Sequence, residues 1–227
     1  MGGVPEQRLV VDVEGINVSA AWIDHPDAGQ VLVLGHGAGG TLDAPFLVGF
    51  ARAAAELGLA TLRFSFVYAE RGRRAPDRPP LLLAASRAAF ARAGALAGDR
   101  PLFAGGKSMG GRIASMAAAE GMPAAGLVFL GYPLHPPGKP DRLRDDHLDY
   151  VPAPMLFLQG TRDPFATPEL LGRVAARLGP RAELRWVDGG DHSFRVPGPR
   201  IDAASIGAGL ASPAAEFARR HATIGLD

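Results

Sequence analysis

The sequence predicts an α/β fold, in which a parallel sheet is covered by helices on both faces. Short apolar runs typical of buried strands alternate with longer stretches that carry apolar residues at helical spacing. Glycine or proline separates most of these segments. With 227 residues, of which 47% are hydrophobic and 21% charged, the chain has an ordinary globular balance. We therefore expect residues 1–227 to form a single domain.

The first two predicted strands form an antiparallel hairpin at the edge of the sheet. Residues 9–13 and 16–23 flank Glu14-Gly15, a dipeptide that favours a turn. Residues 31–37, VLVLGHG, are a continuous apolar run that ends in glycine, which indicates a central strand. The remaining segments follow the alternation: helices over 45–57, 81–97, 112–121, 168–179 and 202–221, and strands over 59–66, 101–106, 125–133, 154–160 and 182–188.

Residues 133–153 fit neither pattern. They are rich in proline and charge and can hold at most a short helix. We expect an irregular surface excursion over the carboxyl edge of the sheet, in which His135 and His147 have solvated or capping roles.

Composition excludes several classes of function. The formal net charge of +1 gives no general attraction to nucleic acid or to an anionic membrane, and we expect neither as a partner. The absence of cysteine excludes disulfides, a thiol nucleophile and cysteine-ligated metals. No apolar run approaches the roughly 18 residues of a membrane span. We expect a soluble, cytoplasmic protein that holds no metal or cofactor.

A serine at a strand-to-helix junction is the main candidate for chemistry. Residues 102–118 read LFAGGKSMGGRIASMAA, and Gly106-Lys107-Ser108-Met109-Gly110 matches the pattern G-x-S-x-G between a predicted strand and a predicted helix. Such a sharp turn strains its central residue and requires small residues two positions away on each side. The hydroxyl of Ser108 is then exposed, and the backbone N–H of Met109 faces the space for an oxyanion. The alternative is a tight turn with an incidental serine.

A serine nucleophile needs a base and a carboxylate that orients the base. His192 lies in VDGGDHSF, directly after the last predicted strand, so it should reach the same edge of the sheet as Ser108. Asp163, in LQGTRDPF, follows another strand at that edge and is the expected acid. Asp188 and Asp191 are competitors within the loop of the histidine. A further alternative is that Asp163 only caps a helix.

The second oxyanion donor should come from the loop after residues 31–37. This loop contains Gly37-Ala38-Gly39-Gly40, whose small residues allow main-chain N–H groups close to a substrate, and Ala38 is the expected donor. His36 is expected to anchor the loop by side-chain hydrogen bonds. The letters of residues 35–40 also match G-x-G-x-x-G, but no acidic residue ends the next strand, as ribose binding would require.

Two charged residues flank the serine. Lys107 and Arg112 are candidate substrate contacts that would favour an anionic acyl group, and His36 is a further candidate contact. The alternative for Lys107 and Arg112 is that they are exposed charges near the start of a helix, and this alternative is the one we prefer.

The segments GGKSMGGR, GHGAGG, GYPLHPPGKPDRLRDDHL and LQGTRDPF together resemble the α/β-hydrolase superfamily. The resemblance is to the group that includes the testis-expressed-30 proteins and the hydrolase-like domain of a chromatin-complex subunit, with dienelactone-hydrolase-like enzymes as more distant relatives. It spans roughly residues 30–195. It implies an eight-stranded, mostly parallel sheet, little or no cap domain, and a triad in the chain order Ser108, Asp163, His192. Dienelactone hydrolases use a cysteine, so their activity is not implied.

The expected function is that of a carboxylesterase-like serine hydrolase. It would cleave a small ester, or less readily a thioester or amide, through an acyl-enzyme. An alternative is a catalytically idle interaction module that keeps the fold for binding. A third is acyl transfer to an acceptor other than water, which needs the same triad.

Overall fold

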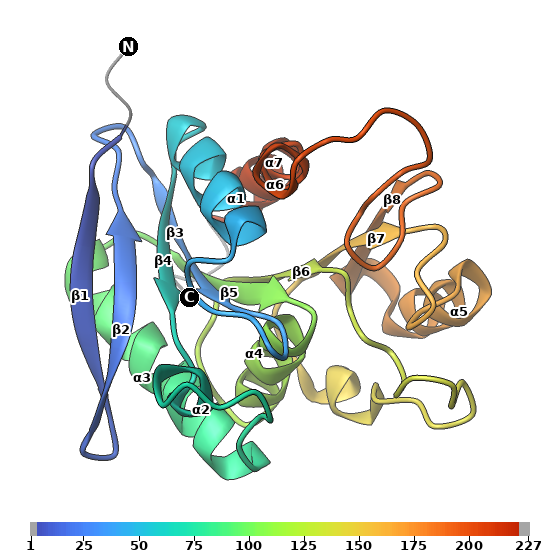
Figure 1. Ribbon diagram of the computed structural model, residues 1–227, viewed down its shortest axis with the longest axis horizontal. Helices are drawn as coiled ribbons and strands as arrows, with labels where there is room; N and C mark the ends of the chain where they lie inside the picture. The colour runs from blue at the N-terminus through green and yellow to red at the C-terminus, as the bar shows by residue number, and fades with distance from the viewer. Residues whose placement is uncertain (1–3, 223–227) are drawn as a thin grey trace.

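The centre of the molecule is an eight-stranded sheet. The structure is a computed structural model that describes residues 4–222. The strand order is β1-β2-β4-β3-β5-β6-β7-β8, with β2 antiparallel to both β1 and β4 and all other neighbours parallel (Figure 1). The strands are β1 Glu6–Val13, β2 Ile16–Ile23, β3 Gln30–Gly35, β4 Leu59–Phe64, β5 Leu102–Lys107, β6 Gly126–Leu130, β7 Met155–Gly160 and β8 Ala182–Val187.

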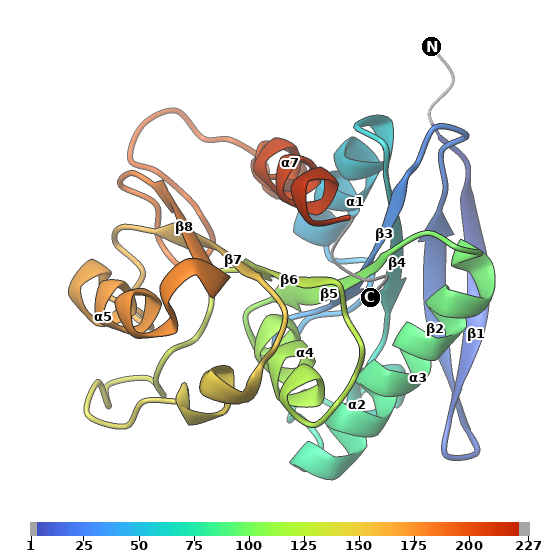
Figure 2. The same ribbon diagram turned by 180° about the vertical axis from the view of Figure 1, so that it is seen from behind.

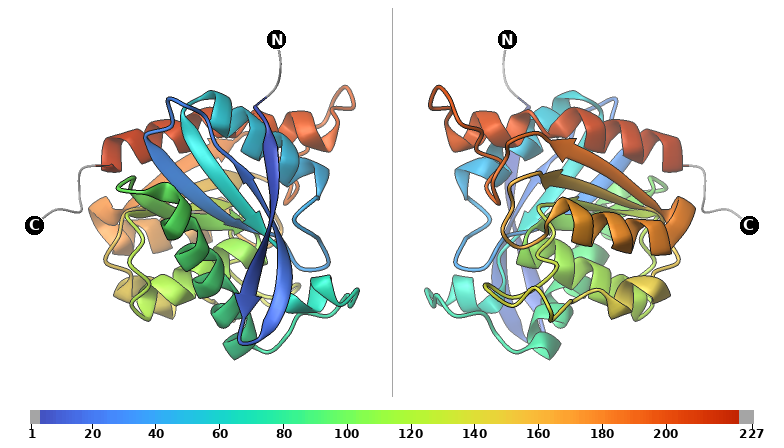
Figure 3. Two further views of the ribbon diagram at one scale, coloured as in Figure 1. Left: turned by 90° about the vertical axis from the view of Figure 1, so that its left-hand side faces the viewer. Right: turned by 90° about the vertical axis from the view of Figure 1, so that its right-hand side faces the viewer.

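Helices cover both faces of the sheet. One face carries α2 Val67–Glu70, α3 Pro79–Ala97, α4 Met109–Ala119 and α5 Pro168–Leu178. The other carries α1 Pro45–Glu56, α6 Ala203–Ala208 and α7 Ala211–His221. Figure 2 shows α1 and α7 side by side, and Figure 3 shows the two helical layers above and below the sheet. No helix within residues 4–222 has both the length and the apolar character that crossing a bilayer requires.

The central strands supply a separate hydrophobic core to each layer. In β3, Val31 and Val33 face the core under α3 and α4, whereas Leu32 and Leu34 face the core under α1 and α7. This division follows from the two-residue period of a strand, and it explains why the predicted central strand reads as a continuous apolar run. Each such side chain that is fully buried stabilises the fold by about 1.5–3 kcal/mol.

The predicted hairpin is present at one edge of the sheet. Glu14 and Gly15 both have positive φ, 53° and 83°, and β1 and β2 pair on either side of them. Two positive φ angles in a two-residue connection match the right-handed twist of the strands that it joins.

Several predicted boundaries differ from the structure by a few residues, and three of the helices show why. The helix predicted over 112–121 begins at Met109, directly after the serine, because the turn itself supplies the first helical residues. The helix predicted over 81–97 begins at Pro79, since prolines are compatible with the first turn. The helix predicted over 202–221 is two helices, α6 and α7, separated at residues 209–210.

The excursion over residues 133–153 is placed differently from the prediction. Its beginning stays at the carboxyl edge, where the backbone N–H of His135 donates to the carbonyl of Phe165 at 3.2 Å. Its later part turns away, and the short 3₁₀ helix Asp146–Tyr150 packs against α4 (Figure 1). Leu148 and Val151 are fully buried in the core, which fixes this course. The prediction was therefore wrong for the second half of the segment.

Candidate active site

Ser108 occupies a strained turn between β5 and α4. Its φ and ψ are 51° and −114°, a conformation that costs a non-glycine residue about 1–3 kcal/mol. A Cβ atom at Gly106 or at Gly110 would each lie 2.1 Å from the carbonyl oxygen of Gly35 in β3. The turn is therefore pressed directly onto the neighbouring strand, which explains why glycine occupies both positions of the G-x-S-x-G pattern.

Ser108, His192 and Asp163 form a continuous chain of hydrogen bonds. The Ser108 hydroxyl donates to His192 Nε2 at 2.9 Å, and His192 Nδ1–H donates to Asp163 Oδ2 at 2.7 Å. The proton positions follow from this network, because a carboxylate only accepts. The three residues follow β5, β7 and β8, whose carboxyl ends meet at one edge of the sheet.

Asp163 is buried, with 2% of its surface exposed, and its oxygens are fully engaged. Besides the histidine, it accepts hydrogen bonds from Gln159 Nε2 at 2.6 Å and from the backbone N–H of Phe165 at 2.8 Å. The amide oxygen of Gln159 in turn accepts from the N–H of Tyr132 at 2.8 Å, which fixes the orientation of the amide. Three donors on one buried carboxylate stabilise its charged form.

The two competing carboxylates have other partners. Asp191 accepts from the backbone N–H groups of Ser193 at 2.7 Å and Arg195 at 2.9 Å. Asp188 accepts from the hydroxyl of Thr161 at 3.3 Å. Asp191 thus closes the loop that carries His192, whereas Asp163 contacts the imidazole.

The histidine loop is anchored in the core. Phe194 has a positive φ of 61°, is buried with 3% exposed, and stacks on Phe46 of α1 with the ring centroids 5.8 Å apart. On the other side, the ring of Phe165 lies 4.5 Å from the ring of His192. Aromatic contacts above and below the loop therefore restrict the motion of the imidazole.

The two predicted oxyanion donors belong to the two segments that adjoin the serine, the start of α4 and the glycine turn. Met109 is the first residue of α4, so its N–H has no carbonyl one turn earlier in the helix to bond. Ala38 is exposed, in a turn closed by a hydrogen bond from Gly40 N–H to Gly37 O at 3.0 Å. A Cβ atom at Gly37 would lie 3.7 Å from Cβ of Ser108, so this turn borders the serine. The arrangement leaves both N–H groups available to a bound oxygen.

His36 anchors the turn from inside the fold. It is fully buried, its Nδ1–H donates to Gly37 O at 2.8 Å, and its Nε2 accepts from the N–H of Phe66 at 3.1 Å. Burial lowers the pKa of His36, which favours the neutral ring that these two bonds require. The candidate role of His36 as a substrate contact does not fit, because both nitrogens are engaged and no part of the ring reaches the surface.

The hydroxyl of Tyr68 supports the same turn. It accepts from the N–H of Gly39 at 3.3 Å and donates to Gly37 O at 3.4 Å. Tyr68 is fully buried, and burial raises its pKa, so the phenol stays protonated and can donate.

Neither flanking charge is simply a solvated side chain. Lys107 Nζ donates to the backbone carbonyl of His192 at 2.6 Å, and burial lowers the pKa of Lys107 to about 8. Arg112 lies one turn along α4 from the serine, and its Nε is buried without a hydrogen-bond partner. Its charge lies near Tyr132 and Arg144, on the side of α4 that the 3₁₀ helix covers.

The two histidines of the excursion are not solvated, contrary to the prediction. His147 Nε2 lies 2.8 Å from the hydroxyl of Ser115 and 3.3 Å from that of Tyr132. Burial and the nearby charge of Arg112 lower the pKa of His147 to about 4. His135 is buried with 3% exposed, and its Nδ1 lies 2.9 Å from the carbonyl oxygen of Pro136. Both rings are parts of the packed structure.

Two adjoining hollows lie near the candidate catalytic residues, although Ser108 itself lines neither; the smaller reaches the site through the glycine turn and Lys107. The smaller, of about 190 Å³, is lined mainly by apolar groups: Gly37, Ala38, Gly40, Ala44, Phe46, Leu47, Lys107, Ser193, Arg195, Ala203 and Ile206. The larger, of about 650 Å³, lies under the loop 194–202 and shares Arg195, Ala203 and Ile206 with the first.

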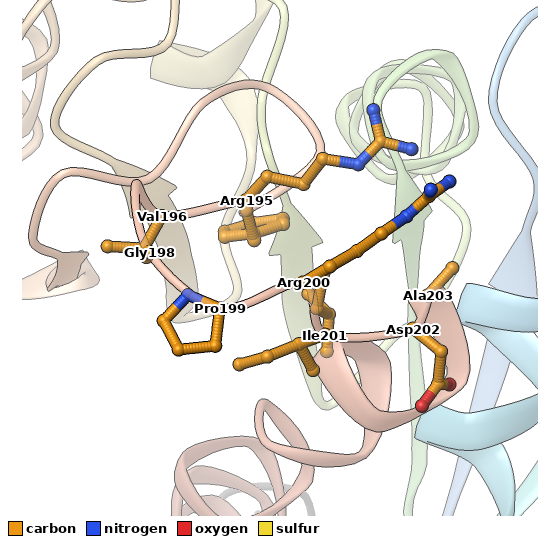
Figure 4. Close-up of a pocket in the computed structure, with 10 residues that line it drawn as sticks. Arg195, Val196, Gly198, Pro199, Arg200, Ile201, Asp202 and Ala203 are labelled. Carbon is orange, nitrogen blue, oxygen red and sulfur yellow. The ribbon is translucent and has the colours of Figure 1, made fainter.

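Arg195 and Arg200 carry the charge of the larger hollow. Figure 4 shows their side chains extending from the loop in the same direction, while the carboxylate of Asp202 points away from them. Asp202 is engaged in capping α6, where it accepts from Ser205 N–H at 2.9 Å and from the Ser205 hydroxyl at 2.7 Å. The acidic residue of this lining therefore does not neutralise the two guanidinium groups.

Three supporting residues were missed by the sequence analysis. They are Gln159, Tyr68 and Asp191, which hold the acid, the glycine turn and the histidine loop in place. A glutamine at the end of the apolar strand LFLQG was the available signal for Gln159, because a buried amide needs a specific partner. Nothing in the local pattern marked Tyr68, whose partners are about thirty residues away.

The chain is similar to known hydrolases in sequence pattern and in fold. Residues 28–211 match a family model described as an alpha/beta hydrolase domain. A dienelactone hydrolase from Anabaena variabilis superposes with a TM-score of 0.76 at 22% identity, over 97% of this chain and 100% of that chain. A serine hydrolase without lid from Xanthomonas campestris gives 0.73 at 21%, over 95% and 94% of the two chains. Est1E from Butyrivibrio proteoclasticus gives 0.73 at 17%, over 97% and 99%.

Proposed function

The chain belongs to the alpha/beta hydrolase family, and from that premise we propose that it is a serine hydrolase that cleaves small carboxylic esters. The observation that supports this most directly is the chain of hydrogen bonds from Ser108 through His192 to Asp163. In the proposal, Ser108 is the nucleophile, His192 the general base and Asp163 the group that orients the imidazole.

The reaction proceeds in two stages. His192 Nε2 takes the proton of Ser108 as its oxygen attacks the ester carbonyl, and the imidazolium then protonates the departing alcohol. In the second stage His192 removes a proton from a water molecule, whose oxygen attacks the acyl carbonyl. The bond to the Ser108 oxygen then breaks, the imidazolium returns the proton to that oxygen, and the acid is released. Asp163 remains charged throughout and stabilises the imidazolium.

The backbone N–H groups of Met109 and Ala38 stabilise the tetrahedral oxyanion in this proposal. They lie at the start of α4 and in the glycine turn, the two segments that adjoin Ser108. The removal of one such donor raises the barrier by about 3 kcal/mol in enzymes of this kind. His36 and Tyr68 keep the turn in place and do not contact the substrate.

The hollows favour a compact acyl group and a charged leaving group. The space of about 190 Å³ beside Phe46, Leu47 and Ile206 suits a short apolar acyl chain. The larger hollow would receive the alcohol, and the guanidinium groups of Arg195 and Arg200 favour one that carries a carboxylate or a phosphate. Thioesters with a charged thiol would fit the same space.

The remaining proposals concern the partners of the protein, its location and its group within the family. The near-zero formal charge supports a small molecule as substrate, with neither nucleic acid nor a membrane as a partner, and a cytoplasmic location. Within the family, the motifs GGKSMGGR and GHGAGG support the group that includes the testis-expressed-30 proteins.

The test is the reaction of Ser108 with a fluorophosphonate probe and with short p-nitrophenyl esters. The wild-type protein should be labelled and should hydrolyse the esters, and Ser108→Ala should lose both properties. Ser193→Ala is the matched control, because Ser193 borders the smaller hollow and its described contact is made by its backbone. A folded wild-type protein that neither reacts nor turns over any ester would instead support the idle interaction module.

A further inference from the structure

Lys107 connects the two halves of the site by a single side chain. It is the last residue of β5 and immediately precedes Ser108 in the chain. Its Nζ donates to the backbone carbonyl of His192 at 2.6 Å, across a sequence separation of 85 residues. The side chain of the residue before the nucleophile therefore bonds directly to the backbone of the base.

The ammonium group lies in an aromatic slot. Nζ is 5.5 Å from the ring centroid of Phe194 and 5.9 Å from that of Phe46, and these two rings stack on each other. Both distances lie within the range in which a cation is attracted to an aromatic face. The slot thus holds the charge of Lys107 beside the loop that carries His192.

Gly131, directly after β6, completes the slot. Its φ is +75°, and a Cβ atom there would lie 3.0 Å from Lys107 Nζ and 3.4 Å from the carbonyl oxygen of His192. A side chain at this position would push against both partners of the hydrogen bond. The chain segments that contain Lys107, Gly131 and His192 therefore approach one another closely here.

Lys107 is partly buried, and its ammonium group has no carboxylate partner within hydrogen-bond distance among the described residues. No ion pair to Lys107 occurs in the part of the chain that the structure describes, and the carboxylates that act on it from a distance are Asp163 and Asp191. Burial without an ion pair is costly, and it lowers the pKa of Lys107. What the ammonium group gains in this position is its hydrogen bond to the backbone carbonyl of His192.

We propose that Lys107 is a positioning residue: it holds the His192 backbone so that the imidazole stays on the hydroxyl of Ser108. The proposal rests on the proposed hydrolase function. The loop needs such a hold because Phe194, two residues after the histidine, has a strained positive φ that would relax if the loop were released. Lys107 is thus not a substrate contact, although its side chain borders the smaller hollow.

The first experiment replaces the ammonium by an apolar group of similar length. Lys107→Met should lower kcat about 10- to 100-fold, because a displacement of about 1 Å between reacting groups costs up to 100-fold in rate. KM should stay within about threefold, since ester binding is not disturbed. The other lysine, Lys139, lies exposed in the excursion, and Lys139→Met serves as the matched control with unchanged kcat.

The second experiment restores the group chemically. Because the chain has no cysteine, Lys107→Cys carries a unique thiol, which can be alkylated in urea before refolding. Alkylation with 2-bromoethylamine creates an isostere of lysine, and alkylation with n-propyl iodide creates an apolar side chain of the same length. The aminoethyl protein should regain most of the wild-type kcat, whereas the propyl protein should not.

A third measurement follows the stability of the loop that carries His192, and it does not depend on turnover. Amide hydrogen exchange at Ser193 and Arg195, whose N–H groups bond Asp191, should be faster in Lys107→Met than in the wild type. The proposal is overturned if kcat is unchanged, if the loss appears only in KM, or if the propyl and aminoethyl proteins are equally active. A wild-type protein that the fluorophosphonate does not label refutes the hydrolase function, whereas unchanged exchange refutes the positioning role.

Discussion

Asp163 illustrates how much of this site is devoted to holding one group still. Its carboxylate accepts three hydrogen bonds, from the side-chain amide of Gln159, the backbone N–H of Phe165 and the imidazole N–H of His192. A carboxylate with this many fixed donors keeps its position and its charge when the imidazole is protonated, which is the state that the proposed reaction must stabilise. The acid is thus held in position partly by Gln159 and Phe165, which take no part in the proposed bond making.

The charge of the larger hollow gives a prediction about specificity. The double variant Arg195→Gln, Arg200→Gln should lose about tenfold or more in kcat/KM for an ester whose alcohol carries a carboxylate, since a charged hydrogen bond contributes about 1.5–3 kcal/mol. It should hydrolyse the neutral ester of equal length at the wild-type rate. The measurement is the ratio of kcat/KM for 4-carboxyphenyl butyrate and 4-carbamoylphenyl butyrate.

Arg173→Gln is the control for this comparison, because Arg173 is exposed on α5, away from both hollows. A ratio that is the same in the double variant and in the wild type contradicts the proposed role of the arginines. Arg112→Gln should also leave the ratio unchanged, because Arg112 lies beside Tyr132 and Arg144 and does not line either hollow.

For single residues, the sequence predicts which side chains belong to the candidate site better than it predicts which groups they contact. Ser108, Asp163 and His192 could be picked out because each follows a recognisable apolar strand, and the structure brings them within hydrogen-bond distance. The direction of Lys107 could not be predicted, because its partner is the backbone of a residue 85 positions away. For the same reason the burial of His135 and the contact of His147 with Ser115 were not visible in a segment rich in proline and charge.

Among the elements, the contact between β3 and α4 fixes the nucleophile. The carbonyl oxygen of Gly35 lies against both Gly106 and Gly110, so the strand and the helix touch through their backbones. This contact leaves no room for adjustment, and it explains how a strained serine conformation persists.

This contact predicts a stability difference between two glycine substitutions. Gly110→Ala places a Cβ atom 2.1 Å from Gly35 O and should destabilise the fold by about 1–3 kcal/mol, as overpacking does. Gly172→Ala, in the middle of α5 and with open space around its Cβ position, should instead stabilise the fold by about 0.5–1 kcal/mol. Urea unfolding measures both, and a neutral Gly110→Ala would show that the helix can move away freely.

The order of elements was predictable from the periodicity of the apolar residues, whereas several boundaries were not. The residues 209–210 that divide α6 from α7 lie within an alanine-rich stretch whose pattern is helical throughout, and the division reflects packing of α6 against α1. Similarly, the second half of the excursion follows Leu148 and Val151 into the core, a long-range effect that local composition opposes.

For the molecule as a whole, the partly buried His147 makes stability depend on pH. Its pKa is lowered from 6.5 to about 4 by burial and by Arg112, against the opposing charges of Asp145, Asp146 and Glu120. Between these two values the unfolded chain binds a proton that the folded chain does not, so stability should fall as the pH is lowered from about 6.5 to 4.

Urea unfolding at several pH values tests this dependence. His147→Gln should lose less stability than the wild type between pH 7 and pH 4, because the variant has no proton to bind at this position. Between pH 7 and pH 9 the two proteins should change in parallel, since His147 is neutral in both the folded and unfolded states there. Parallel curves in the acidic range as well would show that the ring is protonated in the fold.

The walls of the smaller hollow come from residues 37–47 and 193–206, and the base is the last of the three reacting residues in the chain. A domain generally folds as a unit during synthesis, so the three reacting residues come together only after the segment with His192 has left the ribosome. A nascent chain therefore holds the alcohol without its proton acceptor and without an acyl pocket. Under the proposed function, reactivity toward esters would therefore begin only when translation has passed the loop and α6.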